Sequence, residues 1–341
     1  VAVGRWALTG DTKGSKSVAV GYNSLGTQNF TSSTDSFNTA VGCQAGISVT
    51  TGTENTIIGG RAGDALTDAD KNVAVGSEAL SADTLGSNSV AVGRAALANQ
   101  NFTSATDSYN TAVGARAGVE VTTGVNNTLI GGLAGDAITT GSQNTGIGVL
   151  SLSGNTTGAS GTAIGYAALL GNTTGCCNTG LGKGAMQTNT TGAENVAVGD
   201  SALHKNTTAS YNTAIGSLAL FDNTTGASNV AVGYLALGDN TTAANNTAVG
   251  YAALTANTTG TANTAVGAGV LDAATTASNN TAVGKDALED TSTGANNTAV
   301  GQAALKSNTT GASNVAIGYI ALTSNTTGLY NVALGQNALG G

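Results

Sequence analysis

Residues 246–262 read N-T-A-V-G-Y-A-A-L-T-A-N-T-T-G-T-A, and the same pattern begins again at residue 263. A glycine closes the Thr-Ala-Val segment of each copy, here Gly250 and then Gly267. We number positions from this glycine, so the preceding Asn is at position −4 and the following Leu is at position +4. Internal repeats of this kind decide the architecture of a chain before any other feature does.

The glycine at position 0 recurs along the whole chain. Twenty occurrences define nineteen intervals, seventeen of 17 residues and two of 21 residues. They are Gly4, Gly21, Gly42, Gly59, Gly76, Gly93, Gly114, Gly131, Gly148, Gly165, Gly182, Gly199, Gly216, Gly233, Gly250, Gly267, Gly284, Gly301, Gly318 and Gly335. A period this regular predicts that each repeat is one structural unit stacked on the next.

The residue types within one repeat predict a coil of a β-solenoid. Thr-Ala-Val is typical of a strand, Ala-Leu at positions +3 and +4 supplies a second apolar segment, and Thr-Thr-Gly supplies a turn. Two short strands and two turns would close a flattened coil. Because one coil cannot bury its apolar side alone, we expect residues 1–341 to form one all-β domain, a parallel β-roll of about twenty coils.

The alternation within the strand predicts which side chains enter the core. Position −3 carries Val or Thr, and position −1 carries Val, Ile or Leu. The side chains at these two positions point to one side of the strand, and the Ala at position −2 points to the other. We expect the bulky row to fill the core and the Ala row to lie outside. A strand that is apolar on both faces is usually buried on both. The apolar Ala row therefore predicts that copies of the chain pack side by side, most simply as a parallel homotrimer. The alternative is that this row lies at a tight corner of the coil, where small residues are tolerated.

Asparagine occupies position −4 in sixteen of nineteen repeats. Stacked asparagine side chains can hydrogen-bond along a column of strands. We expect such a ladder to include Asn38, Asn55, Asn110, Asn195, Asn246 and Asn331. For a second asparagine column, in the Asn-Thr-Thr-Gly segments, turn formation is a sufficient explanation.

Four repeats have Gly in place of Leu at position +4 and gain an apolar residue three positions later. The glycines are Gly46, Gly63, Gly118 and Gly135, and the apolar residues are Val49, Leu66, Val121 and Ile138. We expect the later residue to fill the core there, because an empty cavity would destabilise the coil.

Residues 21–92 and 93–164 match each other and form a 72-residue super-repeat. Each contains one 21-residue interval, with insertion loops at 28–38 and 99–110. Loops on rigid scaffolds often carry binding residues. We expect the loop aromatics Phe30, Phe37, Phe102 and Tyr109 to make contacts with a partner. The alternative is that each aromatic pair only fixes its own loop.

The segments S-V-A-V-G at 17–21 and 89–93 and N-V-A-I-G at 314–318 resemble the head repeats of YadA-like trimeric autotransporter adhesins. The resemblance covers the whole chain at the level of the repeat, although the period of 17 is longer than theirs. It implies a left-handed parallel β-roll, trimerisation and an adhesive or spacer role on a bacterial surface. The repeats are also similar to parts of phage tail fibres.

The composition limits the classes of function. The 341 residues include 51 Gly and no Pro, only 9% are charged, and the net charge is −8. A globular domain usually has about 25% charged residues. Without a basic stripe we expect no nucleic-acid partner, and without an apolar run of about 20 residues we expect no membrane-spanning segment. The chain opens in mid-pattern without a signal peptide, so we expect part of a longer protein.

Candidates for catalysis are few. His204 is the single histidine, which argues against Ser-His-Asp and Cys-His chemistry. Cys43 lies too many repeats from Cys176 and Cys177 to pair with them, so we expect free thiols, with pairing between chains as the alternative. Four carboxylates lack the spacing of calcium-binding rolls: Asp64, Asp68, Asp70 and Asp83. We expect no enzyme activity, no cofactor and no metal site.

Together these patterns predict a structural and adhesive fibre segment on a cell or virion surface. It would act as a rigid, multivalent appendage or spacer. Its expected partners are other copies of the same chain, which could also stack end to end, and a glycan or protein of a host surface or matrix. The alternative is the shaft of a phage tail fibre. A third hypothesis, an ice- or carbohydrate-binding solenoid, is disfavoured because Thr and Val interchange at position −3, as expected for a core position.

Overall fold

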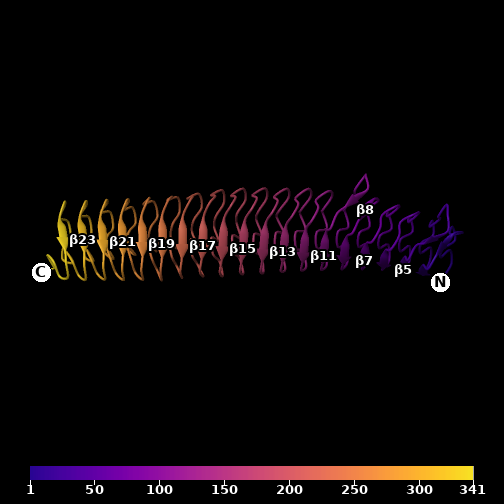
Figure 1. Cartoon of the computed structure of the whole chain (residues 1–341), viewed down its shortest axis with the longest axis horizontal. Coiled ribbons are helices and arrows are strands. Elements are labelled where there is room, and N and C mark those ends of the chain that lie inside the picture. Colours follow the sequence, from indigo (N-terminus) through magenta and orange to yellow (C-terminus); the bar gives the residue numbers. More distant parts are fainter. Residues whose placement is uncertain (341) are drawn as a thin grey trace. The chain divides into compact units, whose positions relative to one another are not determined.

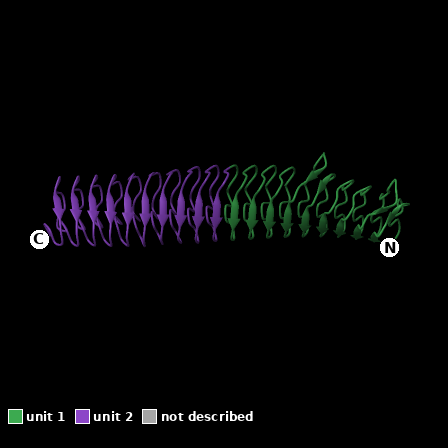
Figure 2. Cartoon of the chain, viewed as in Figure 1, with its two compact units in different colours: residues 1–174 green, residues 175–341 purple. Residues whose placement is uncertain are grey.

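The computed structural model describes residues 1–340, which form a parallel β-solenoid of about twenty coils without any helix (Figure 1). The coils group into two compact units, residues 1–174 and 175–341 (Figure 2). Each coil contributes one short strand, which ends just before the glycine at position 0. The all-β solenoid predicted from the 17-residue repeat is therefore confirmed.

The first unit contains ten strands of the main ladder. They are β1 (Ala2–Val3), β3 (Val18–Val20), β5 (Thr39–Val41), β6 (Thr56–Ile58), β7 (Val73–Val75), β9 (Val90–Val92), β11 (Thr111–Val113), β12 (Thr128–Ile130), β13 (Thr145–Ile147) and β14 (Thr162–Ile164). Two further strand pairs each join an insertion loop to the preceding coil: β4 (Thr34–Asp35) with β2 (Gly14–Ser15), and β10 (Thr106–Asp107) with β8 (Gly86–Ser87).

The second unit also contains ten strands of the main ladder. They are β15 (Thr179–Leu181), β16 (Val196–Val198), β17 (Thr213–Ile215), β18 (Val230–Val232), β19 (Thr247–Val249), β20 (Thr264–Val266), β21 (Thr281–Val283), β22 (Thr298–Val300), β23 (Val315–Ile317) and β24 (Val332–Leu334). Each strand pairs in parallel with the next, and equal positions of the repeat lie opposite each other, as in Ala248 opposite Ala265.

The second predicted strand is absent. The Ala-Leu segment is a series of turns in which the Leu at position +4 adopts a left-handed backbone, with φ of 54° at Leu254 and 52° at Leu237. The backbone amide of this Leu still donates a hydrogen bond to the next coil, as from Leu237 N to the carbonyl oxygen of Ala253 at 3.0 Å. Sequence patterns do not reveal this conformation, because non-glycine residues rarely adopt positive φ.

The strand faces the opposite way from the prediction. The Ala at position −2 is fully buried in the chain's own core, as at Ala248 and Ala265, whereas Thr247 and Val249 beside it stay partly exposed. A coil of 17 residues encloses a thin interior, and the Leu at position +4 already projects into it from the other wall. Only a small side chain fits opposite that Leu, so the Ala row lies inside and the bulky row outside.

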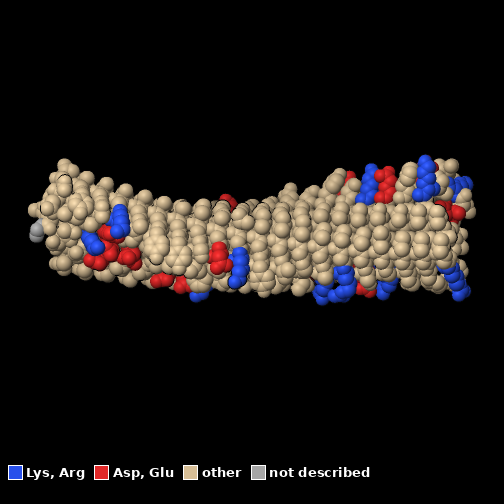
Figure 3. Space-filling model, turned by 90° about the horizontal axis from the view of Figure 1, so that it is seen from below, with Lys and Arg blue, Asp and Glu red and all other residues tan. Residues whose placement is uncertain are grey.

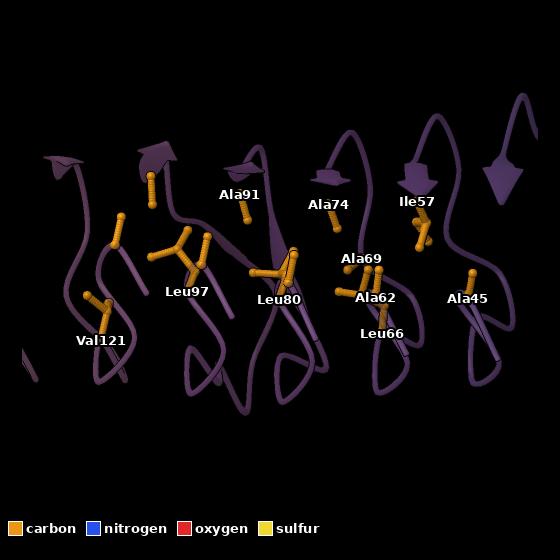
Figure 4. Close-up of a cluster of buried hydrophobic side chains, with 14 of the residues drawn as sticks. Ala45, Ile57, Ala62, Leu66, Ala69, Ala74, Leu80, Ala91, Leu97 and Val121 are labelled. Atoms are coloured by element: carbon orange, nitrogen blue, oxygen red, sulfur yellow. The ribbon is translucent and has the colours of Figure 1, made fainter. Parts of the chain in front are cut away.

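Two coils carry a large residue where the others have Ala or Gly, namely Ile57 (Figure 4) and Leu129, and their neighbours compensate. Ile57 occupies position −2, and a Cβ added to Gly46 would lie only 2.8 Å from its Cδ1. Leu129 is matched in the same way by Gly118, at 2.8 Å. The four apolar residues three positions after the +4 glycines are fully buried, namely Val49, Leu66, Val121 and Ile138. The core is therefore filled there both from the turn and from the strand.

The glycine at position 0 is required by two constraints. At Gly250 the backbone adopts a φ of 143°, and an added Cβ would lie 2.2 Å from the carbonyl oxygen of Gly267 in the next coil. The same contact recurs between other neighbouring coils, for example from Gly42 to Gly59 at 2.4 Å. Stacked coils therefore approach each other so closely at this corner that no side chain fits.

The asparagines at position −4 form a buried hydrogen-bonded ladder. The Asn246 amide N–H donates to Oδ1 of Asn229 at 3.0 Å, and its Nδ2 donates to the carbonyl of Gly260 at 2.9 Å. Among the residues named from the sequence, Asn55 donates to Asn38 Oδ1 at 2.9 Å and Asn331 to Asn314 Oδ1 at 2.9 Å. Each side chain thus joins one coil to the next and satisfies groups that water cannot reach.

The asparagines at position +7 form a second ladder, which turn formation alone does not account for. Nδ2 of Asn223 donates to Oδ1 of Asn206 at 3.0 Å, and Nδ2 of Asn240 donates to Oδ1 of Asn223 at 2.8 Å. The ladder is interrupted after Asn257, because Ala274 stands at the next +7 position. The buried Oδ1 of Asn257 has no hydrogen-bond partner there.

Candidate functional site

The outer face of the main ladder is a regular surface that is present in each unit. We define the outer face as the side chains at positions −3 and −1 of the strands. Position −3 is Thr or Val and position −1 is Val, Ile or Leu in every repeat, and neither position is ever charged. Residues at the same position in successive repeats stack at the strand spacing of about 4.8 Å. The result is two parallel rows, made mostly of β-branched side chains.

These rows remain accessible to solvent. Ile215 exposes 40% of its surface, Val266 37% and Ile317 39%. Figure 3 shows one face of the chain, on which the charged residues form small groups with uncharged surface between them. Contiguous apolar surface beyond a few hundred Å² typically marks an interaction site in a soluble protein. The outer face is therefore the first candidate surface.

The insertion loops are the second candidate surface, and each is fixed to the preceding coil by a short parallel ladder. In the first loop β4 pairs with β2, and Lys16 forms an ion pair with Asp35 at 2.6 Å. That contact and a hydrogen bond from Ser15 lower the pKa of the exposed Asp35. In the second loop β10 pairs with β8, and Asn88 Nδ2 donates to Asp107 Oδ1 at 2.7 Å.

The structure separates the four predicted contact aromatics into two pairs. Phe30 and Phe102 are each only 6% exposed, so they anchor their loops and are not free to touch a partner. Phe37 and Tyr109 are 51% and 56% exposed. The Lys16 ammonium lies 4.9 Å from the Phe37 ring centroid, which holds that ring in place. Only Phe37 and Tyr109 can therefore act as contact residues.

A cavity of about 560 Å³ lies beside the second loop. It is lined by Asp68, Asp70, Leu85, Ser87, Ala105, Thr106 and Asp107. Its carboxylates already accept hydrogen bonds, since Asp68 Oδ1 accepts from the hydroxyls of Thr50 and Thr51, and these bonds lower the pKa of Asp68. The hollow is thus an acidic, water-accessible surface beside an exposed tyrosine.

Asp83 anchors the base of the second loop. It accepts hydrogen bonds from Gln100 Nε2 at 2.6 Å and from the amide of Gly86 at 3.0 Å. Gln100 Oε1 in turn accepts from Asn110 of the first ladder at 2.9 Å. Burial raises the pKa of Asp83 despite these hydrogen bonds, which act in the opposite direction.

The remaining residues with chemically active side chains are His204 and three cysteines. His204 stacks on Phe221 with ring centroids 5.1 Å apart. Cys43, Cys176 and Cys177 are free thiols. Within residues 1–340 no three side chains of His, Cys, Asp or Glu are arranged to hold a metal ion.

No protein-family model and no curated protein matches the chain. The part of the chain that the structure describes also has no helix of the length and apolarity needed to span a membrane. The candidate surfaces must therefore be interpreted from their own geometry.

Proposed function

We propose that this chain is a rigid segment of an extracellular or surface fibre, and that it works as a spacer and adhesive. The supporting observation is the repetition of the same backbone and asparagine hydrogen bonds from coil to coil within each unit. Such a column can bend only by distorting many bonds at once. Long, regular solenoids present extended surfaces and are well suited to this role.

We also propose that the fibre is a parallel homotrimer in which the outer faces of three chains meet. The sequence predicts a trimer with the Ala row at the interface, but the structure buries that row within the chain. The interface that we propose therefore consists of the outward-facing Thr, Val and Ile rows. These rows are partly exposed and carry no charged residue, and charged residues are depleted at the centre of protein interfaces.

Charged substitutions on the outer face test this assembly. Val249→Lys combined with Val266→Lys places two ammonium groups where the copies would meet, and we expect chains that elute as monomers in size-exclusion chromatography with light scattering. Thr242→Lys with Thr259→Lys is the matched control, because these residues are exposed in the turn of the same region. Equal assembly of both variants would argue against the outer face as the interface.

The adhesive contact is proposed for the exposed loop aromatics. Phe37→Ala with Tyr109→Ala should abolish binding of the full chain to immobilised matrix proteins or host glycans. Tyr211→Ala, which removes a tyrosine that is 61% exposed outside the loops, should not. If both variants bind as the unaltered chain does, the loops are not the adhesive surface. A phage tail-fibre shaft is the alternative setting, and the domains adjoining this segment in the full protein distinguish the two.

Ice binding is a second candidate because the strand orientation removes the argument against it. Thr at position −3 points outward, so rows of Thr and Val lie on the outer face of a free chain. Thermal hysteresis by the wild type that is lost in Thr247→Lys would favour this function. An assembled trimer without any hysteresis would favour the structural role.

A further inference from the structure

Cys176 and Cys177 are the only adjacent cysteines of the chain, and neither forms a disulfide. They occupy the turn before β15, at positions that hold unrelated residues in other coils. Cys177 is exposed and Cys176 is partly exposed, so reagents and ions in solution can reach both sulfurs.

The backbone holds this pair in a fixed geometry. Cys177 adopts a left-handed φ of 61°, and the Cys176 carbonyl accepts the Glu194 amide at 3.1 Å. The next residue, Asn178, is buried in the ladder and donates from Nδ2 to the carbonyl of Gly192 at 2.7 Å. The neighbouring Cys176 side chain raises the pKa of the exposed Cys177 thiol.

We propose that Cys176 and Cys177 form a two-thiol binding site for thiophilic centres of low coordination number, of which trivalent arsenic in an organic arsonous acid is the test case. Soft thiolate ligands select such centres. A structural zinc ion requires four protein ligands, and within residues 1–340 no third His, Cys, Asp or Glu joins the pair.

A bridging atom suits this pair better than a disulfide does. A sulfur–sulfur bond of about 2.05 Å between neighbouring residues closes a small ring and strains the peptide bond between them. An inserted arsenic atom enlarges the ring and lets the two sulfurs lie farther apart than a disulfide allows. Two S–As bonds form and two As–OH bonds break, each thiol proton leaves with a hydroxyl as water, and no oxidant or reductant is needed.

The test uses phenylarsonous acid with the full chain in the presence of excess 2-mercaptoethanol, which competes with single thiols. We expect intact-mass spectrometry to show one phenylarsenic group per chain. After removal of the monothiol, Ellman's reagent should titrate one thiol in place of three, because only Cys43 remains free. Adding 2,3-dimercaptopropanol should restore all three.

Cysteine-to-serine variants assign the site. Cys176→Ser and Cys177→Ser should each lose the retained group, whereas Cys43→Ser should keep it. No retained arsenic on the wild type, or retention that survives Cys177→Ser, would overturn the proposal. The thiol titration of the wild type decides the question independently if a variant fails to fold.

Discussion

At the scale of single residues, the glycine at position 0 constrains the fold most strongly. Gly250→Ala would place a Cβ against the Gly267 carbonyl, at a φ that L side chains rarely adopt. We expect a loss of about 2–4 kcal/mol, in the range of strained-backbone and overpacking substitutions. Urea denaturation followed by circular dichroism measures it. Thr261→Ala is the control, because Thr261 lies exposed in a turn, and it should leave the midpoint nearly unchanged. Equal midpoints for the two variants would contradict the constraint at Gly250.

The gap in the second asparagine ladder offers a stabilising substitution. Ala274 occupies the ladder position and leaves Asn257 Oδ1 buried without a partner. Ala274→Asn supplies an Nδ2 donor at the place where other coils have one. We expect a gain of about 1 kcal/mol, the usual net value of a buried hydrogen bond. An unchanged or lower denaturation midpoint would show that the coil at this position cannot accept the longer side chain.

The raised pKa of Asp83 predicts how the stability of the folded chain changes with pH. Its pKa in the folded chain is raised above the unfolded value of 3.8, so the folded state holds the proton more tightly. The contribution of Asp83 to stability is therefore largest below that value and is lost as pH rises through the raised pKa. We expect the stability of the wild type relative to Asp83→Asn to fall as the pH rises above about 4. A difference that stays constant with pH would contradict the shift.

At the scale of the coil, the orientation of the strand has a direct test. Ala248→Val adds two methyl groups to a core that is already filled, and overpacking of this kind costs about 1–3 kcal/mol. Thr247→Val, one residue earlier, changes the outer face and should leave the unfolding free energy of a single chain nearly unchanged. Equal effects of the two substitutions in chemical denaturation would contradict the inward-facing Ala row.

Much of the coil could be predicted from sequence. The 17-residue period indicated the stacking, and Asn246 at a constant phase indicated a hydrogen-bonded asparagine ladder. The orientation of Thr247-Ala248-Val249 could not be predicted, because alternation fits either face until the thickness of the core is known. The left-handed backbone of Leu254 could not be predicted either, because that conformation is rare outside glycine. The division of the loop aromatics into buried Phe102 and exposed Tyr109 depends on contacts with the preceding coil.

At the scale of the whole molecule, the outer face links the fold to the proposed function. The inward Ala row makes each chain self-sufficient in its core, and the outward Thr, Val and Ile rows remain for assembly. A trimer would bury these rows and leave the insertion loops and exposed turns for contact with other molecules. Stiffness and multivalency would then arise from the same repeat.

The mass of the wild-type chain in solution tests this account most directly. Native mass spectrometry at micromolar concentration should show one species at three times the chain mass of 32.8 kDa. A particle of the single-chain mass, under conditions in which circular dichroism shows the β-fold intact, would contradict assembly through the outer face.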